Sequence, residues 1–590
     1  MFLRSTTRKK DGKHHRYWSV VENHRVAGGR VVQRQVLYLG EINDSQRDGW
    51  LRTIEVLEDG HPSPKTMALF PDDRTVEVDD KQVVQIRLKD LELCRPRQFG
   101  ACWLAGTLYE QLGLDTFWAE RLPQSRKGTR WDLIVEALCC YRLIDPGSEW
   151  RLHRHWYGTS AMADLLGAGF ELVEIHKLYE CLTRLCKHKR ALFDHLTQRW
   201  KDLFNTRFDI LLYDLTSTYF ESNPPFPEGD KRRFGYSRDK RSDCVQVVIA
   251  LIVTLEGFPL AYEVMAGNTT DNTTLKAFLT KKQYGKAERI WVMDRGIPTE
   301  EVLHEMRMNS VHYLVGTPKG RLTRYEKELA DLPWHKVRDG VDVKLLPQDS
   351  EVYVLAQSRD RIHKERSMRQ RQLKRLWKRL HEIEDMQLTR DQLLLRLGAA
   401  KQQSPSAWRF VEIAIHKEDA SFRFSLRKDK LRKARRREGR YLLRTNLVGR
   451  DPAEMWEFYT QLVHVEEAFG NLKGDLALRP IYHQNEDRIE AHIFVAFMAY
   501  ALHVTLSHRL RNLAPGLTPR AALEKFSAVH MIDVHLPTTD GRRVIMSRYT
   551  KPEPDLQILL TQLQLHLPAQ PRPRMMVKDE VSEPHVVKTF

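Results

Sequence analysis

The chain has 590 residues, which is enough for several domains of common size. Hydrophobic residues make up 42% of it, so the chain can bury sizeable cores and is not a wholly disordered protein. Lys and Arg total 95 against 78 Asp and Glu, which gives a formal net charge of +17. This excess favours a polyanionic partner such as nucleic acid, although many basic proteins bind none.

The seven cysteines are spread thinly and form no recurring CxxC pairs, so the sequence predicts neither a disulfide framework nor a zinc site. The N-terminal stretch MFLRSTTRKKDGKHHRYW is basic and lacks the apolar segment of a secretory signal. No uncharged apolar run approaches the length that spans a membrane. We therefore expect a protein of the reducing cytoplasm, associated with the nucleoid if it binds DNA.

The first two regions differ in the period of their apolar residues. Residues 1–97 are expected to form short strands, with a hairpin turn at Gly28 and Gly29. The Lys, Arg and His around this hairpin suit a DNA-binding region or, equally well, a solvated basic hairpin. Residues 98–205 carry apolar residues at helical spacing and predict a helical domain, interrupted by the turn sequence DPGS at 145–148.

Residues 206–318 change to a strand pattern. The runs FDILLYDLT, VQVVIALIVT, PLAYEVM and RIWVMD are apolar and short, and a helical stretch, TLKAFLTKK, precedes the last of them. Strand hairpins followed by a helix and a further strand describe a mixed sheet. The predicted fold class is therefore α/β, with a mixed sheet flanked by helices.

Residues 319–445 interrupt this pattern and predict an insertion domain. It contains a long, highly charged helix and the basic run 427–440, where nine Lys or Arg stand against two acids. The basic run could follow DNA or form a solvated arm, and we favour DNA. Residues 446–515 return to helical spacing, and residues 516–590 form a C-terminal region whose Pro-rich tail is expected to be flexible.

Two acidic residues follow buried apolar runs: Asp214 after ILLY and Asp294 after IWVM. A carboxylate at the end of a buried strand is costly without a partner, and a divalent cation that prefers oxygen ligands is a common partner. A single Asp of this kind is usually a turn residue or a helix cap. Two of them in one basic α/β chain indicate a metal site.

The segment DPAEMWEFYTQLVHVEEAFGNLKGDL places a third acid in a specific setting. It begins with a capping Asp and with Pro at the first helical position. Tyr459, Glu466 and Lys473 follow one another at intervals of seven residues, nearly two helical turns, so we expect all three on one helix face. The plain alternative is a solvated amphipathic face. A metal-holding carboxylate between a Tyr and a Lys, however, suits a DNA backbone lying across the helix.

These three blocks resemble the DDE transposases of bacterial insertion sequences, in the group marked by Y-x2-R-x3-E-x6-K. The block YDLTSTYFES resembles the first-Asp motif, WVMDRG resembles the second-Asp motif with Arg295 after the carboxylate, and the third block has the expected spacing. Leu462 stands where the pattern has Arg, and this departure bears on one phosphate contact, not on the metal site. Glu467 lies about 100° round the helix from Glu466, so Glu466 is the better ligand.

The resemblance covers roughly residues 1–510. The stretch GYSRDKRSDCVQVVIALIVTLEGFPL resembles the second and third strands of the catalytic core in that group, and RPIYHQNEDRIEAHIFVAFMAYAL resembles the segment after its Glu helix. This implies a ribonuclease H-like core in two parts, residues 206–318 and 446–515. The separation of 172 residues between Asp294 and Glu466 is too long for a compact core, so a β-rich insertion like that of other members is implied.

The resemblance also implies the chemistry. Asp214, Asp294 and Glu466 would be the catalytic residues and would hold two Mg²⁺ ions, for which Mn²⁺ can substitute, roughly 3.5–4 Å apart. Water would free a 3′-hydroxyl at the transposon end, a hairpin would commonly form and reopen, and the hydroxyl would then join target DNA. The implied partners are the terminal inverted repeats and target DNA, and joining two ends implies a homodimer on DNA.

Tyr459, Lys473 and Arg295 are assigned to phosphates of the transposon end, with a solvated role equally open for Arg295. Trp334 or Trp377 could receive a base turned out of the DNA stack, although core packing is the commoner role of a Trp. Two other functions are compatible with the sequence. One is a metal-dependent nuclease that cuts DNA without joining it, and the other is a non-catalytic DNA-binding protein derived from a transposase.

Overall fold

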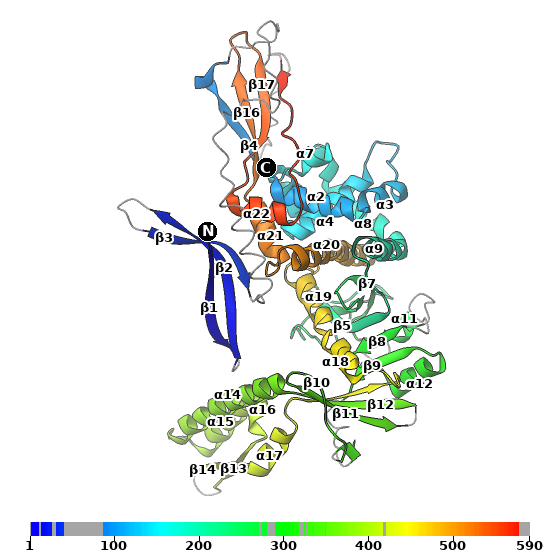
Figure 1. Ribbon diagram of the computed structural model, residues 1–590, viewed down its shortest axis with the longest axis vertical. Coiled ribbons are helices and arrows are strands. Elements are labelled where there is room, and N and C mark those ends of the chain that lie inside the picture. Colours follow the sequence, from blue (N-terminus) through cyan, green and yellow to red (C-terminus); the bar gives the residue numbers. More distant parts are fainter. Residues whose placement is uncertain are drawn as a thin grey trace.

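The computed structural model has a nine-stranded mixed sheet at its middle (Figure 1). The helical region and a small C-terminal sheet lie at one end of the molecule, and a helical lobe lies at the other. The α/β class predicted from the sequence is confirmed. The structure describes residues 2–10, 13–25, 31–40, 86–270, 274–279, 289–317, 324–325, 328–329, 331–348, 350–416 and 421–576.

The N-terminal strands form a separate antiparallel sheet in the order β1-β2-β3. Its strands are β1 (Phe2–Lys10), β2 (Lys13–Arg25) and β3 (Val31–Gly40). Pairing of β2 with β3 confirms the predicted hairpin, although its Gly28–Gly29 turn lies outside the described residues. Val20 and Leu37 are buried in the main apolar cluster, so part of this sheet packs against the rest of the protein.

The helical region is built around α20 (Glu486–Leu513), which packs against its helices and against the central sheet. Its longer helices are α2 (Gly100–Gln111), α3 (Leu114–Arg121), α4 (Trp131–Ile144), α8 (Ile175–Leu185) and α9 (Lys189–Phe204). The predicted turn follows the end of α4, and α5 (Glu149–Arg151) begins after it. By length and composition α20 could cross a membrane, but 94% of its apolar window is buried inside the protein, as in a core helix.

One half of the central sheet has the strand order β7-β6-β5-β8-β9. Its strands are β5 (Ile210–Phe220), β6 (Val245–Val253), β7 (Pro259–Ala266), β8 (Ile290–Met293) and β9 (His312–Gly316). Strands β5, β6 and β7 pair antiparallel, whereas β8 runs parallel to β5 and β9 runs parallel to β8. Three antiparallel strands followed by two parallel ones form the ribonuclease H-like core that the resemblance implies.

The other half of the sheet comes from the insertion, and it continues from β9 in the order β15-β12-β11-β10. These strands are β10 (His335–Arg338), β11 (Val341–Gln348), β12 (Glu351–Ser358) and β15 (Arg440–Thr445). Strand β15 pairs antiparallel with β9, with Leu443 opposite Gly316. The insertion therefore extends the core sheet itself.

Between β12 and β15 the chain forms a lobe with its own apolar cluster. The lobe contains α14 (Arg359–Glu384), α15 (Arg390–Gln403), α16 (Pro405–Trp408), β13 (Val411–Ile415), β14 (Phe422–Leu426) and α17 (Lys428–Arg436). The basic run of the sequence corresponds to α17 and its flanks. The insertion is thus part sheet and part helical lobe, where the resemblance implied a β-rich insertion.

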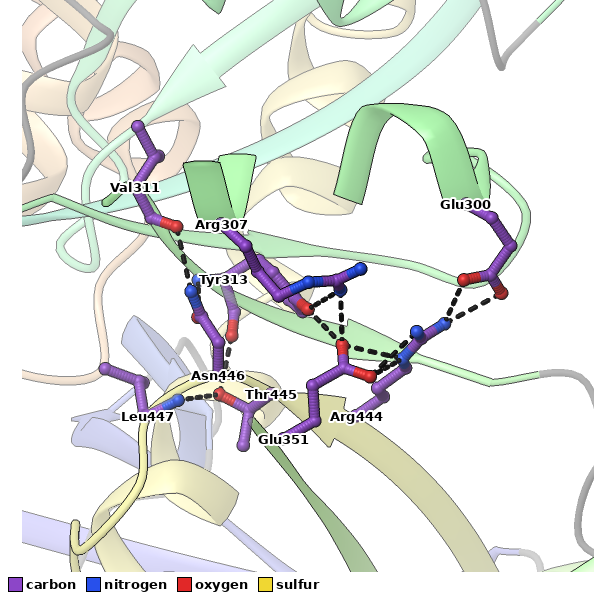
Figure 2. Close-up of polar contacts among 9 residues, drawn as sticks. All are labelled: Glu300, Arg307, Val311, Tyr313, Glu351, Arg444, Thr445, Asn446 and Leu447. Atoms are coloured by element: carbon purple, nitrogen blue, oxygen red, sulfur yellow. Dashed lines mark hydrogen bonds and ion pairs between the residues drawn. The ribbon is translucent and has the colours of Figure 1, made fainter. Parts of the chain in front are cut away.

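A network of ion pairs fastens the inserted strands to the core (Figure 2). Arg444 on β15 donates at 2.8 Å both to Glu351 on β12 and to Glu300 on α12 (Glu300–Met308). Glu351 also accepts from Arg307 of α12 at 2.8 Å, and from the hydroxyl of Tyr313 on β9. Side chains as well as backbone pairing therefore fix the insertion relative to β8 and β9.

The C-terminal region packs beside the start of the helical region. Strand β16 (His530–Pro537) pairs with β17 (Arg543–Tyr549) and with β4 (Glu92–Gln98), and β18 (Arg574–Met576) pairs with β17. Buried Arg97 and Asp533 join β4 to β16 at 2.9 Å. Helices α21 (Pro519–Phe526) and α22 (Pro554–Gln562) complete this region. Part of the expected flexible tail thus forms a strand, while residues 577–590 lie outside the described residues.

Candidate active site

The two predicted aspartates lie side by side on parallel strands. Tyr213 on β5 is opposite Met293 on β8, so the next residues, Asp214 and Asp294, occupy the same level of the sheet. Asp294 directly follows β8, as predicted. The prediction that Asp214 also ends its strand is wrong, because β6 stays paired with β5 beyond the end of β8 and β5 continues to Phe220.

Glu466 reaches the same place from α19 (Val463–Lys473), which packs on β5 and β6. The prediction of one continuous helix is wrong, because α18 (Pro452–Thr460) ends before α19 begins. At the joint, the Leu462 N–H donates to the Tyr459 carbonyl three residues back at 3.2 Å, which is a tightened turn. Tyr459 therefore lies on a different helix from Glu466, while Glu466 and Lys473 share α19.

Electrostatic interactions show that the three carboxylates form one group. The pKa of Asp214 is raised to about 6, first by burial and then by the negative charges of Asp294 and Glu466. The Leu215 backbone N–H and the positive charge of Arg238 act in the opposite direction. Asp294 and Glu466 are exposed, so solvent can reach the group.

The donor set fits a hard divalent cation. Carboxylates that repel one another are stabilised by a cation between them, and Mg²⁺ takes carboxylate oxygens while keeping several waters. Within the described part of the chain, two groups of possible ligands have atoms that all lie within 4.8 Å of one another, Glu92–Cys94–His535 and Glu149–His483–His492, and the three carboxylates are not among them.

Tyr459 contacts the second aspartate directly. Its hydroxyl donates to Asp294 Oδ1 at 3.0 Å. Burial, followed by the charge of Asp294, raises the pKa of Tyr459, so the hydroxyl keeps its proton and remains a donor. Gly316 at the end of β9 permits this contact, because a Cβ there would lie 2.5 Å from the Tyr459 hydroxyl. Gly316 was not predicted from the sequence, where the available signal is a Gly that ends an apolar strand.

The other predicted DNA-binding residues lie on either side of the carboxylates. Arg295 follows Asp294 and is exposed. Lys473 ends α19, and its ammonium pairs at 2.8 Å with Asp239, in the loop between β5 and β6. Burial lowers the pKa of Lys473 and the Asp239 hydrogen bond opposes this. Leu462, which stands where the pattern of the resembled group has Arg, is half-buried against the core at the joint of α18 and α19.

The two tryptophans considered for contact with a base differ in exposure. Trp377 on α14 packs inside the lobe, with its ring centroid 4.8 Å from that of Phe424. Trp334 is 39% exposed and carries Lys344 and Arg440 over its ring. Trp377 is therefore a packing residue of the lobe, and Trp334 is the more accessible ring of the two.

Two family models match the chain. The model described as "Transposase DDE domain" matches residues 206–502, half of the chain, and this range contains all three carboxylates. The model described as "IS1634 family transposase, N-terminal domain" matches residues 3–56. No curated protein matches the chain. With its carboxylates grouped on a ribonuclease H-like sheet, the chain belongs to the DDE transposases of insertion sequences, metal-dependent enzymes of DNA cleavage and strand transfer.

Proposed function

We propose that this transposase cuts the terminal inverted repeats of its own insertion sequence and joins them to target DNA, using two Mg²⁺ ions held by Asp214, Asp294 and Glu466. The observation that carries the proposal is the grouping of three carboxylates from β5, β8 and α19 at one place on the sheet. The net charge of +17 supports a DNA partner. Such DNA lies in the nucleoid, so we place the enzyme in the cytoplasm.

Two of the three carboxylates have hydrogen-bond donors that would help to position them around a reacting phosphate. Metal ions bound there would supply Lewis acidity to the attacking and leaving oxygens of an in-line displacement. Asp214 is fixed within β5 and by the Leu215 N–H, and Asp294 is held by the Tyr459 hydroxyl. Because hydrolysis, hairpin formation and joining are all phosphodiester transfers, one such site would serve each of them in turn.

Basic groups around the site would hold the DNA. Arg295 is exposed beside Asp294, and Lys473 lies at the end of α19, so we assign both to phosphates of the transposon end. Tyr459 would contact the same transposon end at the point where its hydroxyl holds Asp294. We assign recognition of the inverted repeats to residues 1–97, which include the basic β1–β3 sheet. Joining two ends requires two active sites, hence a homodimer on DNA.

A strand-transfer assay tests this function. Precleaved DNA ends, taken from the inverted repeats beside the gene, should become joined to a supercoiled plasmid in Mg²⁺, and uncleaved ends should give a covalently closed terminus. Asp294→Asn should abolish both products. Cleavage without any joined product would mean that the protein is a nuclease. Binding to the ends without cleavage would mean that it is a non-catalytic DNA-binding protein. Two chains per pair of ends in the isolated complex would support the homodimer.

A further inference from the structure

The sequence GYSRDKRSD, residues 235–243, lies in the loop between β5 and β6, beside the active site. The backbone N–H of Arg238 donates to Ser217 Oγ at 3.3 Å, which anchors this loop on the strand that carries Asp214. Arg238 directly precedes Asp239, which pairs with Lys473 at the end of α19. The loop therefore links the strand of Asp214 to the end of α19.

The next residue of this loop, Asp239, holds two cations from a different part of the chain. Its Oδ1 accepts from Lys473 at 2.8 Å and also pairs with the guanidinium of Arg479. The Asp239 side chain is 6% exposed and that of Lys473 is 10% exposed, whereas Arg479 is 32% exposed. One end of this cluster is thus buried, and the other is open to a ligand.

The charges of this cluster do not balance. Two cations, Lys473 and Arg479, share the single carboxylate of Asp239 through its Oδ1. An ion pair between a loop and a helix needs only one acid and one base, so the second cation leaves a surplus positive charge at the end of the cluster where Arg479 is 32% exposed. An anion that binds at this end would compensate the surplus charge. An ammonium and a guanidinium also keep further N–H donors for that anion.

We propose that Arg238, Lys473 and Arg479 form a binding site for a DNA backbone phosphate next to the scissile one, and that Asp239 positions Lys473 and Arg479 for it. This inference rests on the proposed function, which places the scissile phosphate at the carboxylates. The Arg238 backbone is anchored on β5 three residues beyond Asp214, so a DNA strand whose scissile phosphate lies at the carboxylates presents a neighbouring phosphate to this cluster. Asp239 is a positioning residue here, because it contacts the cations and not the DNA.

A salt titration of DNA binding tests the three cations. Binding to a duplex from the inverted repeat is measured in EDTA, so no cleavage is needed. Arg238→Gln and Arg479→Gln should each reduce the slope of log Kd against log salt by about one and weaken binding several-fold at fixed salt. Lys201→Gln is the control, because it removes one exposed cation from α9. If both arginine variants match this control, there is no phosphate site.

A separation of kcat from KM tests the role of Asp239. Asp239→Asn keeps all three cations but releases two of them, so kcat for end cleavage should fall at least ten-fold while KM does not rise, and Asp239→Glu should recover part of the loss. Asp243→Asn is the matched control, since that acid pairs with Arg241 at the exposed side of the same loop. A faster Asp239→Asn enzyme would mean that Asp239 blocks the site, and unchanged kcat would also overturn the proposal.

The two assays distinguish this inference from the proposed function. A wild-type protein that binds ends but never cuts them would defeat the proposed function, while the salt slopes in EDTA would still report the phosphate site. Conversely, normal cleavage by Arg238→Gln, Arg479→Gln and Asp239→Asn would leave the transposase intact and remove the site. Thermal unfolding of each variant shows whether it folds. If Asp239→Asn does not fold, the two arginine variants still test the phosphate site.

Discussion

Two groups of acidic side chains are built on the same central sheet, and they are held in opposite ways. Glu300 and Glu351 both face Arg444, whose side chain is 8% exposed and bonds each of them. Asp214 instead lies near the like charges of two other carboxylates, and its pKa is raised to about 6 by burial and by those charges. The first group fastens the insertion to the core, and the second is the proposed catalytic site.

The difference shows how a structural acid can be told from a catalytic one in this fold. A carboxylate that is paired with a buried arginine has its charge compensated and stabilises the strands around it. A carboxylate grouped with other acids destabilises the protein until a cation binds, so such a group is a candidate metal site. Charge balance, more than burial or position in a strand, therefore separates the two.

The largest effect should come from removing a carboxylate of the catalytic group. Glu466→Gln should reduce end cleavage by about three orders of magnitude or more, since a lost ligand removes several kcal/mol of transition-state stabilisation. Glu467→Gln is the matched control, because Glu467 is the next residue on α19 and bonds His464 at 3.3 Å. An equal loss in both variants would point to the helix rather than to a ligand, and full activity of Glu466→Gln would remove Glu466 from the site.

The arginine group should instead govern stability. Glu351→Ala leaves Arg444 buried with much less compensation and should lower the free energy of unfolding by about 3 kcal/mol. Glu300→Ala removes the partner that is 56% exposed and should lower it by less than about 1 kcal/mol. Urea unfolding measures both variants. If the two losses were equal, or if Glu351→Ala abolished cleavage without loss of stability, the two groups would not be distinct.

Asp214 should make the metal-free protein less stable as pH rises. Its pKa is near 3.8 in the unfolded chain and about 6 in the folded protein. Between these values the folded protein holds a proton that the unfolded chain has released, so the free energy of unfolding falls with rising pH. Asp214→Asn should remove this fall and stabilise the metal-free protein at pH 7.5 by about 1–3 kcal/mol.

Thermal unfolding in EDTA at pH 4.5 and pH 7.5 measures this effect as a difference between wild type and Asp214→Asn. Addition of Mg²⁺ at pH 7.5 should then raise the Tm of the wild type more than that of the variant, because only the wild type regains a complete set of ligands. Identical pH profiles in EDTA would show that Asp214 has no raised pKa, and an equal response to Mg²⁺ would show that it is no ligand.

The sequence predicted those parts of the site that local patterns determine. Asp294 could be placed because a short apolar run ends at it and Arg-Gly follows. The end of β5 could not be predicted, because it depends on pairing with β6. The residues that follow Asp214 do not show that this pairing exists. The joint at Leu462 also escaped prediction, because no Gly or Pro marks it and its tightened turn depends on how α18 and α19 pack.

Contacts between distant residues were also out of reach. Lys473 bonds Asp239 across 234 residues of sequence, and a spacing pattern within one helix carries no information about such a partner. The same spacing suggested that Tyr459 and Lys473 have equivalent roles beside Glu466. The structure separates them, because Tyr459 bonds a carboxylate and Lys473 belongs to a group of cations. What decides the difference is the arrangement of β5, β8 and the loop before β6.

The smallest fall in kcat should come from removing a residue that positions a metal ligand, compared with removing the ligand itself. Tyr459→Phe removes the hydroxyl that donates to Asp294 at 3.0 Å and keeps the aromatic ring beside Tyr441. Because the carboxylate remains, we expect only about a five-fold fall in kcat, equivalent to roughly 1 kcal/mol, and an unchanged rise of Tm with Mg²⁺. Gly316→Ala should cause at least as large a fall with the tyrosine retained, since its Cβ would press on the same hydroxyl. A loss in Tyr459→Phe as large as that in Glu466→Gln would mean that the tyrosine acts in the reaction itself, and the contrast between ligands and their supports would not hold.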